Sequence, residues 1–304
     1  VKFQTFKAEN IILPDGPKAQ YHIETTGSDS EQSWYDLLKE QEISYDMHVQ
    51  LINHCKKKNI IFMSTPYDKE SADLLESLDV SCYKIASTDT NNYPLLKHIA
   101  KKGIPMIIST AMSTFEEIIE AVNVVRETGL NDIAVLQCTG NYPSKLEDSN
   151  LKVMNTYKDE FQCPIGYSDH TPHLINAISA TAMGANIFEK HFTLDKKFHG
   201  PDHRMSLEPD ELKQTVKSIR QTEIALGTHK KNVLKVEKEN RVNLRKSLVA
   251  VKDISAGQSI DSNMIDIKRP GTGLEPKNYS LVLGKKLKVD IKKDSVLKED
   301  FIIW

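Results

Sequence analysis

The sequence lacks the features that mark several classes of protein. Among its 304 residues are only four cysteines, with no C-x-x-C pair, so neither a structural zinc site nor a disulfide framework is predicted. No apolar run approaches the roughly 18 residues that a membrane-spanning helix needs. Forty basic residues stand against 42 acidic ones, and no segment has the one-sided positive charge that binds nucleic acid. We therefore expect a cytoplasmic protein with reduced thiols and with neither membrane nor nucleic acid as a partner.

The length allows one barrel-sized domain and a smaller one. The chain begins with Val1-Lys2-Phe3-Gln4, which has the pattern of a strand already under way, with no Met and no element before it. We expect a first strand and helix to be missing ahead of Val1.

Short apolar runs alternate with amphipathic segments of helix length as far as Gly227. One such helix starts at the capping sequence Ser113-Thr114-Phe115-Glu116, and another starts near Pro209. The predicted strands are Val1 to Gln4, Ile60 to Ser64, Cys82 to Ala86, Pro105 to Ser109, Ile133 to Gln137, Cys163 to Gly166 and Asn186 to Glu189.

Repeated strand–helix units predict an α/β protein with a parallel sheet, either doubly wound or a (β/α)₈ TIM barrel. Nearly every predicted strand ends in polar residues, as at Ser64-Thr65, Ser109-Thr110 and Ser168 to His170. In a barrel all these ends meet on one face, whereas the edge strands of an open sheet have no reason to carry them. The pattern favours a barrel over residues 1–227.

The residue composition and the pattern of apolar residues change after Gly227. Residues 228–245 are charged and poor in glycine, which indicates a linker or linking helix. Residues 246–304 have short β-type runs and a weak repeat, in which Asp253-Ile254 recurs 37 residues later as Asp290-Ile291. We expect a small β-rich domain with pseudo-two-fold symmetry.

Five of the ten histidines lie between His170 and His203. His170 and His191 follow successive predicted strands, so adjacent barrel strands would bring both rings to one metal ion. Histidine with oxygen ligands and open water positions suits Mn²⁺, Fe²⁺, Co²⁺, Zn²⁺ or loosely held Mg²⁺. The alternative is a pair of polar residues that only form hydrogen bonds on loops.

Lys2, Lys84 and Lys190 lie near strand ends beside serine and threonine hydroxyls. Several cations at the mouth of a barrel would bind a phosphate and a carboxylate. The alternative is a set of solvated lysines, but Lys2 and Lys84 lie inside apolar runs, where an unpaired charge is costly. Gly200-Pro201-Asp202-His203 adds a rigid turn that presents a carboxylate.

Several further motifs occur in a characteristic order. They are Val1-Lys2-Phe3-Gln4-Thr5-Phe6, Met63-Ser64-Thr65-Pro66, Tyr83-Lys84-Ile85-Ala86-Ser87, Ile107-Ile108-Ser109-Thr110, Cys138-Thr139 with Tyr142-Pro143, Gly166-Tyr167-Ser168-Asp169-His170-Thr171, Glu189-Lys190-His191-Phe192-Thr193 and Gly200-Pro201-Asp202-His203. Together they resemble the bacterial sialic-acid synthase family, whose members make N-acetylneuraminic, legionaminic or pseudaminic acid. Lys268-Arg269-Pro270-Gly271 resembles that family's C-terminal antifreeze-like (SAF) domain.

The resemblance implies a transferase that condenses phosphoenolpyruvate with an N-acyl amino sugar and releases phosphate. It also implies a divalent metal, Mn²⁺ or Mg²⁺ with Co²⁺ as a further alternative, and a domain-swapped homodimer. The implied roles are metal binding by His170 and His191, phosphoenolpyruvate binding by Lys2, Gln4, Thr65, Lys84, Ser87, Ser109 and Ser168, and sugar binding by Tyr142, Glu189, Asp202 and the partner subunit's Arg269. Glu189 and Lys84 are the implied catalytic residues, with Glu189 either moving protons or positioning substrate.

Other functions remain open from the residues alone. Another phosphoenolpyruvate-dependent barrel, which makes a phosphorylated sugar acid, would lack the SAF-like module. A non-catalytic sugar-binding or ice-binding protein would not need both a metal pair and an anion site.

Overall fold

A computed structural model describes residues 1–26, 28 and 31–304 of the chain. The chain divides into two compact units, Val1–Gly227 and Thr228–Trp304. Each unit is described below by itself.

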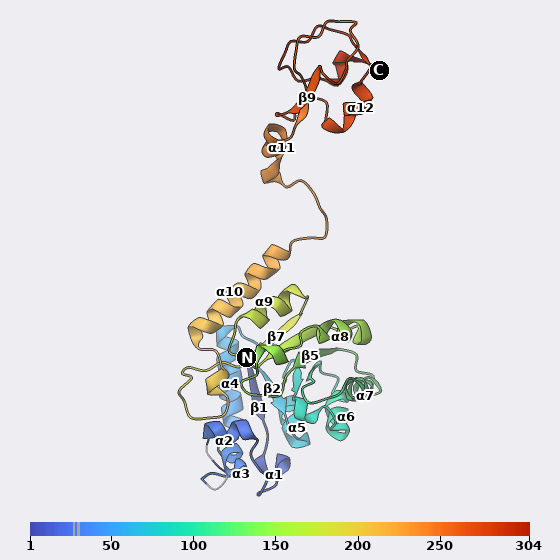
Figure 1. The fold of residues 1–304 in the computed structure, drawn as a ribbon. Helices are drawn as coiled ribbons and strands as arrows, with labels where there is room; N and C mark the ends of the chain where they lie inside the picture. The colour runs from blue at the N-terminus through green and yellow to red at the C-terminus, as the bar shows by residue number, and fades with distance from the viewer. Residues whose placement is uncertain (27, 29–30) are drawn as a thin grey trace. The chain divides into compact units, whose positions relative to one another are not determined.

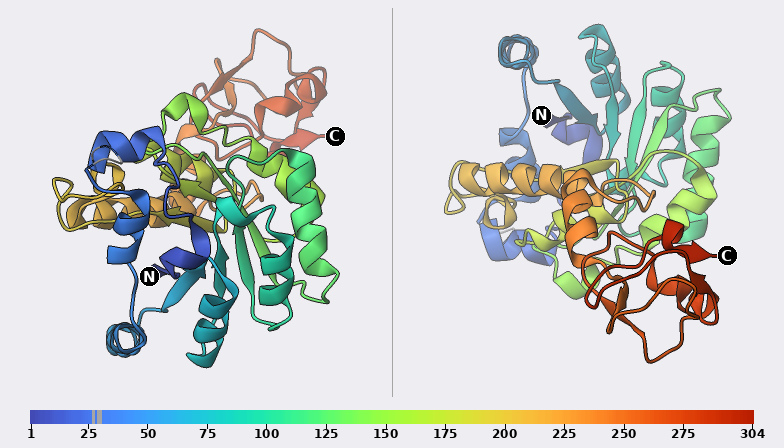
Figure 2. Two further views of the ribbon diagram at one scale, coloured as in Figure 1. Left: turned by 90° about the horizontal axis from the view of Figure 1, so that it is seen from below. Right: turned by 90° about the horizontal axis from the view of Figure 1, so that it is seen from above.

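The first unit is built on a parallel sheet whose strands lie side by side in chain order. Helices follow the strands along the chain and cover the outer side of the sheet (Figures 1 and 2). The strands are β1 (Lys2–Thr5), β2 (Met63–Pro66), β3 (Tyr83–Ile85), β4 (Met106–Ser109), β5 (Ile133–Cys138), β6 (Ile165–Asp169) and β7 (Ile187–Lys190). The covering helices are α4 (Tyr45–Lys58), α5 (Lys69–Ser77), α6 (Tyr93–Ala100), α7 (Phe115–Arg126), α8 (Val153–Phe161), α9 (Ile175–Ala182) and α10 (Pro209–Leu226).

The sheet curls into a half-barrel. Lys2 on β1 and Glu189 on β7 come together with Nζ 3.9 Å from Oε1, although their strands are the two ends of the sheet. The prediction of an α/β fold with parallel strands is confirmed. The full TIM barrel type is not confirmed. Within the described residues the sheet has the seven strands that we predicted and leaves β1 and β7 as edges, because closure needs a complete circuit of paired strands.

Alternation along the strands separates the core from the interior of the curl. Tyr83 and Ile85 are fully buried among the helices, and the Tyr83 hydroxyl donates to Ala72 O of α5. Successive side chains of a strand point to opposite faces, so Lys84, between them, points inward. The same rule sets Phe3, which stacks on Phe62, opposite Lys2 and Gln4.

Local signals position the helices to within a few residues. The capping box of α7 uses Thr114 and Glu117 rather than the Ser113 to Glu116 register that we predicted. The predicted second strand started too early, since β2 begins only at Met63, and Ile60 and Ile61 are exposed. Apolar character alone does not separate a strand from the turn that leads into it.

Three short helices that we did not predict lie between β1 and α4. They are α1 (Ala8–Ile11), α2 (Gln20–Thr26) and α3 (Trp34–Glu40). The Glu42 carboxylate ties the first of them to the third: it accepts from the Ala8 N–H and pairs with the ammonium groups of Lys7 and Lys39.

The second unit contains the symmetry that the repeat predicted. It consists of α11 (Lys238–Leu244), the antiparallel pair β8 (Ser247–Ala250) and β9 (Ile265–Lys268), α12 (Tyr279–Val282), and the antiparallel pair β10 (Lys286–Leu287) and β11 (Ile302–Ile303). Asp253 accepts a hydrogen bond from the Lys293 N–H, and Asp290 accepts one from the Ala256 N–H. These bonds are equivalent under the 37-residue offset and cross between the two halves.

Candidate active site

The inward-facing side chains of the half-barrel form a charged cluster. The Lys84 ammonium lies 3.9 Å from Glu189 Oε2, while Lys2 approaches the other carboxylate oxygen. Burial alone would raise the pKa of Glu189, but Lys84, Lys2 and the Ser168 hydroxyl lower it to about 2. Burial lowers the pKa of Lys84, against the effect of Glu189. The site thus holds two ammonium groups against one carboxylate, which leaves positive charge for an anion.

Hydroxyl groups surround the cluster. Lys84 Nζ donates to Ser109 Oγ over 2.5 Å, and Ser168 Oγ donates to Glu189 over 2.8 Å. Ser87 Oγ accepts from the Ala111 N–H and lies 3.3 Å from the thiol of Cys138. The buried Thr65 Oγ1 has no hydrogen-bond partner among the described residues. A buried hydroxyl without a partner marks a place where a polar ligand group would be accepted.

The two predicted histidines lie together beside this cluster. The ring centroids of His170 and His191 are 5.4 Å apart, and the Tyr142 ring packs 4.2 Å from that of His170. Asp202 places a carboxylate oxygen 3.4 Å from His191 Nδ1. The pKa of each histidine is lowered to about 4, chiefly by burial. The nearby His191 also lowers the pKa of His170, and Lys2 does the same for His191. Both rings are therefore neutral at physiological pH.

Neutral imidazole is the form that binds metal ions, and the hydrogen bonds suit that role. His170 Nδ1 donates to Thr139 O over 2.7 Å, which leaves Nε2 with its lone pair, as in metal-bound histidines. Within the described part of the chain, no three or more histidine, cysteine or acidic residues form a metal-binding group. Protein ligands to a divalent ion here would be limited to the two imidazoles, and water or substrate oxygen would have to fill its remaining positions.

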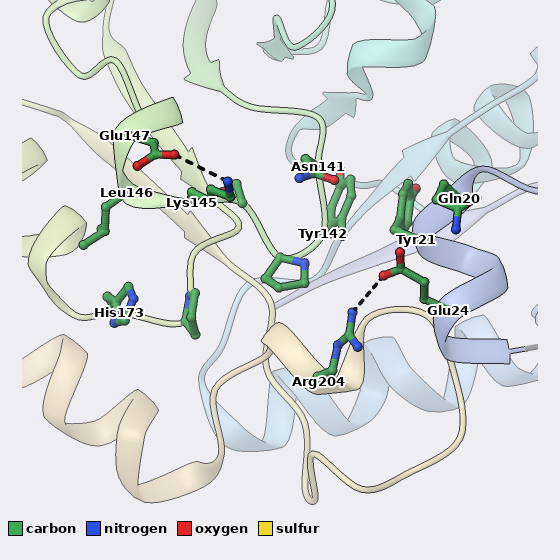
Figure 3. Close-up of a pocket in the computed structure, with 13 residues that line it drawn as sticks. Gln20, Tyr21, Glu24, Asn141, Tyr142, Lys145, Leu146, Glu147, His173 and Arg204 are labelled. Carbon is green, nitrogen blue, oxygen red and sulfur yellow. Dashed lines mark ion pairs between the residues drawn. The ribbon is translucent and has the colours of Figure 1, made fainter.

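A cavity of about 660 Å³ opens beside Tyr142 (Figure 3). The Tyr21 ring of α2 packs at a tilt against the Tyr142 ring, with centroids 4.9 Å apart, and an ion pair between Glu24 and Arg204 crosses one side at 3.7 Å. The sequence did not predict that α2 lines this cavity, because α2 is short and no motif connects Tyr21 to Tyr142, more than a hundred positions away.

The structure gathers most of the predicted site residues. In the first unit, the charged cluster, its hydroxyl groups and the histidine pair lie together on the inner side of the sheet. Gln4 shares the inward face of β1 with Lys2. Arg269 belongs to the second unit, where it is exposed and its Nε donates to Leu244 O. The prediction that Lys190 joins Lys2 and Lys84 at the anion site is wrong. Lys190 is buried in an ion pair with Asp169, because the residue after Glu189 must point to the opposite face.

Comparison with protein families gives two matches. The model of the NeuB family matches residues 1–231, and that of the SAF domain matches residues 245–303. The chain belongs to the NeuB family. The resemblance read from the motifs is thereby confirmed.

Relatives of this NeuB-family chain include synthases of several acidic sugars. It is 43% identical to the N,N'-diacetyllegionaminic acid synthase of Campylobacter jejuni over 98% of the chain and 90% of that protein. It is 35% identical to the pseudaminic acid synthase of the same species, over 98% of the chain and 86% of that protein. The crystal structure of N-acetylneuraminic acid synthetase from Leptospira borgpetersenii superposes with a TM-score of 0.67 at 30% identity, covering 79% of this chain and 78% of that one.

Among the described residues, none of the helices combines the length and the apolar character needed to span a bilayer. All four cysteines are free.

Proposed function

We propose that this protein is a nonulosonic-acid synthase that condenses phosphoenolpyruvate with an N-acyl amino sugar. The observation that carries the proposal is the convergence of Lys2, Lys84 and Glu189 beside the His170–His191 pair. The names of the relatives, which are synthases of legionaminic, pseudaminic and N-acetylneuraminic acid, support the same class of product.

The reaction joins C3 of phosphoenolpyruvate to the aldehyde carbon of the open-chain sugar. The aldehyde oxygen becomes a hydroxyl, water adds to C2 of the phosphoenolpyruvate unit, and the C2–O bond to phosphate breaks. The products are the nine-carbon sugar acid and inorganic phosphate. When the sugar is N-acetylmannosamine, the acid is N-acetylneuraminic acid; a 2,4-diacetamido sugar would give a legionaminic- or pseudaminic-type acid.

The lysines and hydroxyls bind the anionic substrate. Lys2 and Lys84 supply charge for the phosphate and carboxylate, and Gln4, Thr65, Ser87, Ser109 and Ser168 supply hydrogen bonds that fix its orientation. Holding the nucleophilic carbon against the aldehyde supplies much of the rate acceleration. The buried Lys84 does this without the reorganisation that a solvated lysine would require.

His170 and His191 are proposed to hold a divalent ion, Mn²⁺ or Mg²⁺ with Co²⁺ as a further alternative. When bound, the ion would supply Lewis-acid polarisation of the sugar's aldehyde oxygen. Tyr142 and Asp202, which border the histidine pair, are proposed to hold the amino sugar. Glu189, beside Lys2 and Lys84, would either accept a proton from the water that adds to C2 or position substrate through its carboxylate oxygens.

The second unit is proposed to complete the site of a partner subunit. Residues 228–245 would act as the linker, and residues 246–304 would carry Arg269 to the partner's amino sugar in a domain-swapped homodimer. Arg269 is exposed, and its turn is fixed by Ser247, whose hydroxyl donates to Pro270 O and accepts from the Gly273 N–H. A guanidinium presented in this way can donate to an acyl carbonyl. Free thiols are consistent with action in the cytoplasm, which we also propose.

The test is a phosphate-release assay with phosphoenolpyruvate and a panel of sugars. The panel contains N-acetylmannosamine, 2,4-diacetamido sugars, and phosphorylated aldoses without an acylamino group as controls. We expect release with at least one acylamino sugar and none with the controls. Release with the phosphorylated aldoses alone would replace this proposal with another class of phosphoenolpyruvate-dependent synthase.

A further inference from the structure

A buried ion pair joins the ends of β6 and β7 on the side of the sheet that faces the helices. Lys190 Nζ lies 2.7 Å from Asp169 Oδ2, and the two side chains are 4% and 0% exposed. The strands pair Asp169 with Lys190, one step beyond the pairing of Ser168 with Glu189. Since side chains alternate, the ion pair lies behind the site while Ser168 and Glu189 face into it.

The pair is part of a network that encloses the backbone of His170. Asp169 Oδ1 accepts from the N–H and the hydroxyl of Thr171, over 3.0 and 2.9 Å. It also accepts from the Asn176 side chain of α9, and Lys190 Nζ donates to Thr171 O as well as to Asp169. His170 stands between Asp169 and Thr171, and His191 directly follows Lys190. The network therefore holds the chain on both sides of one histidine and just before the other.

Stability alone does not account for such a pair. Removing two charges from water is costly, and apolar side chains of the same size often stabilise a fold as well or better. Charged groups supply geometric specificity, because each hydrogen bond fixes the position of the group that it binds. Here the bonds specify how the end of β6 lies against the end of β7, at the one point where the imidazoles of His170 and His191 leave those strands.

We propose that Asp169 and Lys190 form a clamp that sets the spacing of the two histidines for a divalent metal ion. They are positioning residues and do not touch the substrates. The inference rests on the proposed function, in which the two histidines bind the ion. It predicts that loss of the clamp weakens metal binding and leaves the anion site, whose proposed residues other than Ser168 lie on or just after β1 to β4, largely intact.

The first experiment measures Mn²⁺ binding through the electron paramagnetic resonance signal of the free ion. Lys190→Met removes the ammonium and keeps most of the stem. Its Mn²⁺ dissociation constant should rise by about 10- to 100-fold, as for other losses of support to metal ligands. Its affinity for phosphoenolpyruvate, measured without metal, should change less than about threefold, because Lys2, Lys84 and the other residues proposed to bind it lie on other strands, with Ser168 as the one exception.

Lys102→Met is the matched control. Lys102 is 9% exposed and pairs with Asp73 and Glu76 on α5, on the helical surface of the unit and away from the histidines. The same chemical change there should leave the Mn²⁺ dissociation constant at its wild-type value. Equal weakening of Mn²⁺ binding by both variants would attribute the effect to general destabilisation and overturn the clamp.

The double variant Asp169→Asn/Lys190→Met separates positioning from stability. It leaves no unpaired buried charge, and the asparagine can still accept from the Thr171 N–H, so the melting temperature should recover relative to Lys190→Met. The ion pair that joins the end of β6 to the end of β7 is still absent in this variant, so Mn²⁺ binding should stay weak. Recovery of Mn²⁺ affinity together with stability would contradict the proposal. The double variant also carries the test if Lys190→Met does not fold.

The wild-type protein distinguishes failure of the clamp from failure of the proposed function. If it does not bind Mn²⁺, the metal role of the histidines is wrong and the clamp has no purpose. If it binds Mn²⁺ and Lys190→Met binds the ion equally well, the clamp alone is wrong.

Discussion

Lys84 and Glu189 face each other across the interior of the half-barrel, with Nζ 3.9 Å from Oε2. They come from β3 and β7, and Lys84 is 3% exposed at its side chain. Lys2 lies on the other side of the same carboxylate, so one acidic group faces two cations. An excess of positive charge in a partly buried site is costly without an anion, and this cost would favour binding of phosphoenolpyruvate at the proposed site.

Lys84→Met should therefore impair use of phosphoenolpyruvate. The methionine keeps the apolar stem, while the charge and the hydrogen bond to Ser109 are lost. We expect kcat/KM for phosphoenolpyruvate to fall by a factor of about 10 or more, the effect of losing a charged hydrogen bond. Steady-state phosphate release measures kcat/KM, and Lys97→Met, a change at a half-exposed lysine, is the control. An unchanged rate at limiting phosphoenolpyruvate would return Lys84 to a structural role.

Activity should depend on a divalent metal. A chelator should abolish phosphate release, and Mn²⁺ or Mg²⁺ should restore it, because the neutral imidazoles of His170 and His191, whose centroids are 5.4 Å apart, are the proposed ligands. His170→Ala and His191→Ala should resist this rescue. Full activity in chelator, with metal absent by elemental analysis, would eliminate the metal from the mechanism.

Arg269 should act in the site of a partner subunit. Mixing inactive His170→Ala chains with inactive Arg269→Ala chains creates some sites that contain neither change, so part of the activity should return. Mass spectrometry of the mixture checks that subunits exchange. If exchange occurs between dimers and no activity returns, the role across subunits must be abandoned.

Glu42 should contribute to stability in a pH-dependent way. Burial would raise its pKa, but the Ala8 N–H, Lys39 and Lys7 together lower it to about 2 from an ordinary 4.5. A lowered pKa in the folded state means that the contribution is complete above pH 4.5 and disappears as the pH falls toward 2. Glu42→Gln should thus cost about 1 kcal/mol at pH 7 and less at pH 3.

Urea unfolding at the two pH values measures this difference. The exposed Glu40→Gln is the control and should have no comparable effect at either pH. A cost for Glu42→Gln that is the same at pH 3 and pH 7 would show that the carboxylate's charge is not what stabilises α1 against α3.

Patterns within a few residues predicted much of the first unit. The strands around Tyr83 to Ile85 and Met106 to Ser109 were found within one or two residues, because apolar runs between helix-length segments are local signals. The 37-residue repeat predicted the symmetry of the second unit for the same reason. The N-terminal helices were not found, since short helices take their stability from packing rather than from their own sequence.

The histidine pair was also predicted, because the carboxyl ends of adjacent parallel strands must lie side by side. Lys190 was misplaced, because Glu189, Lys190 and His191 are all polar and their sequence does not reveal which of them faces inward. The pairing of β7 with β6 decides this, since it sets Lys190 beside Asp169 on the helical side.

By itself, therefore, the sequence determined the family, the parallel α/β order and the residue types available for chemistry, all of which are encoded in local runs and spacings. Only the tertiary structure decided that Lys2 and Lys84 converge on Glu189, and that the Tyr21 ring packs against that of Tyr142. These relationships join residues far apart in the chain. They depend on the curl of the sheet and the phase of side-chain alternation, which no short segment specifies alone.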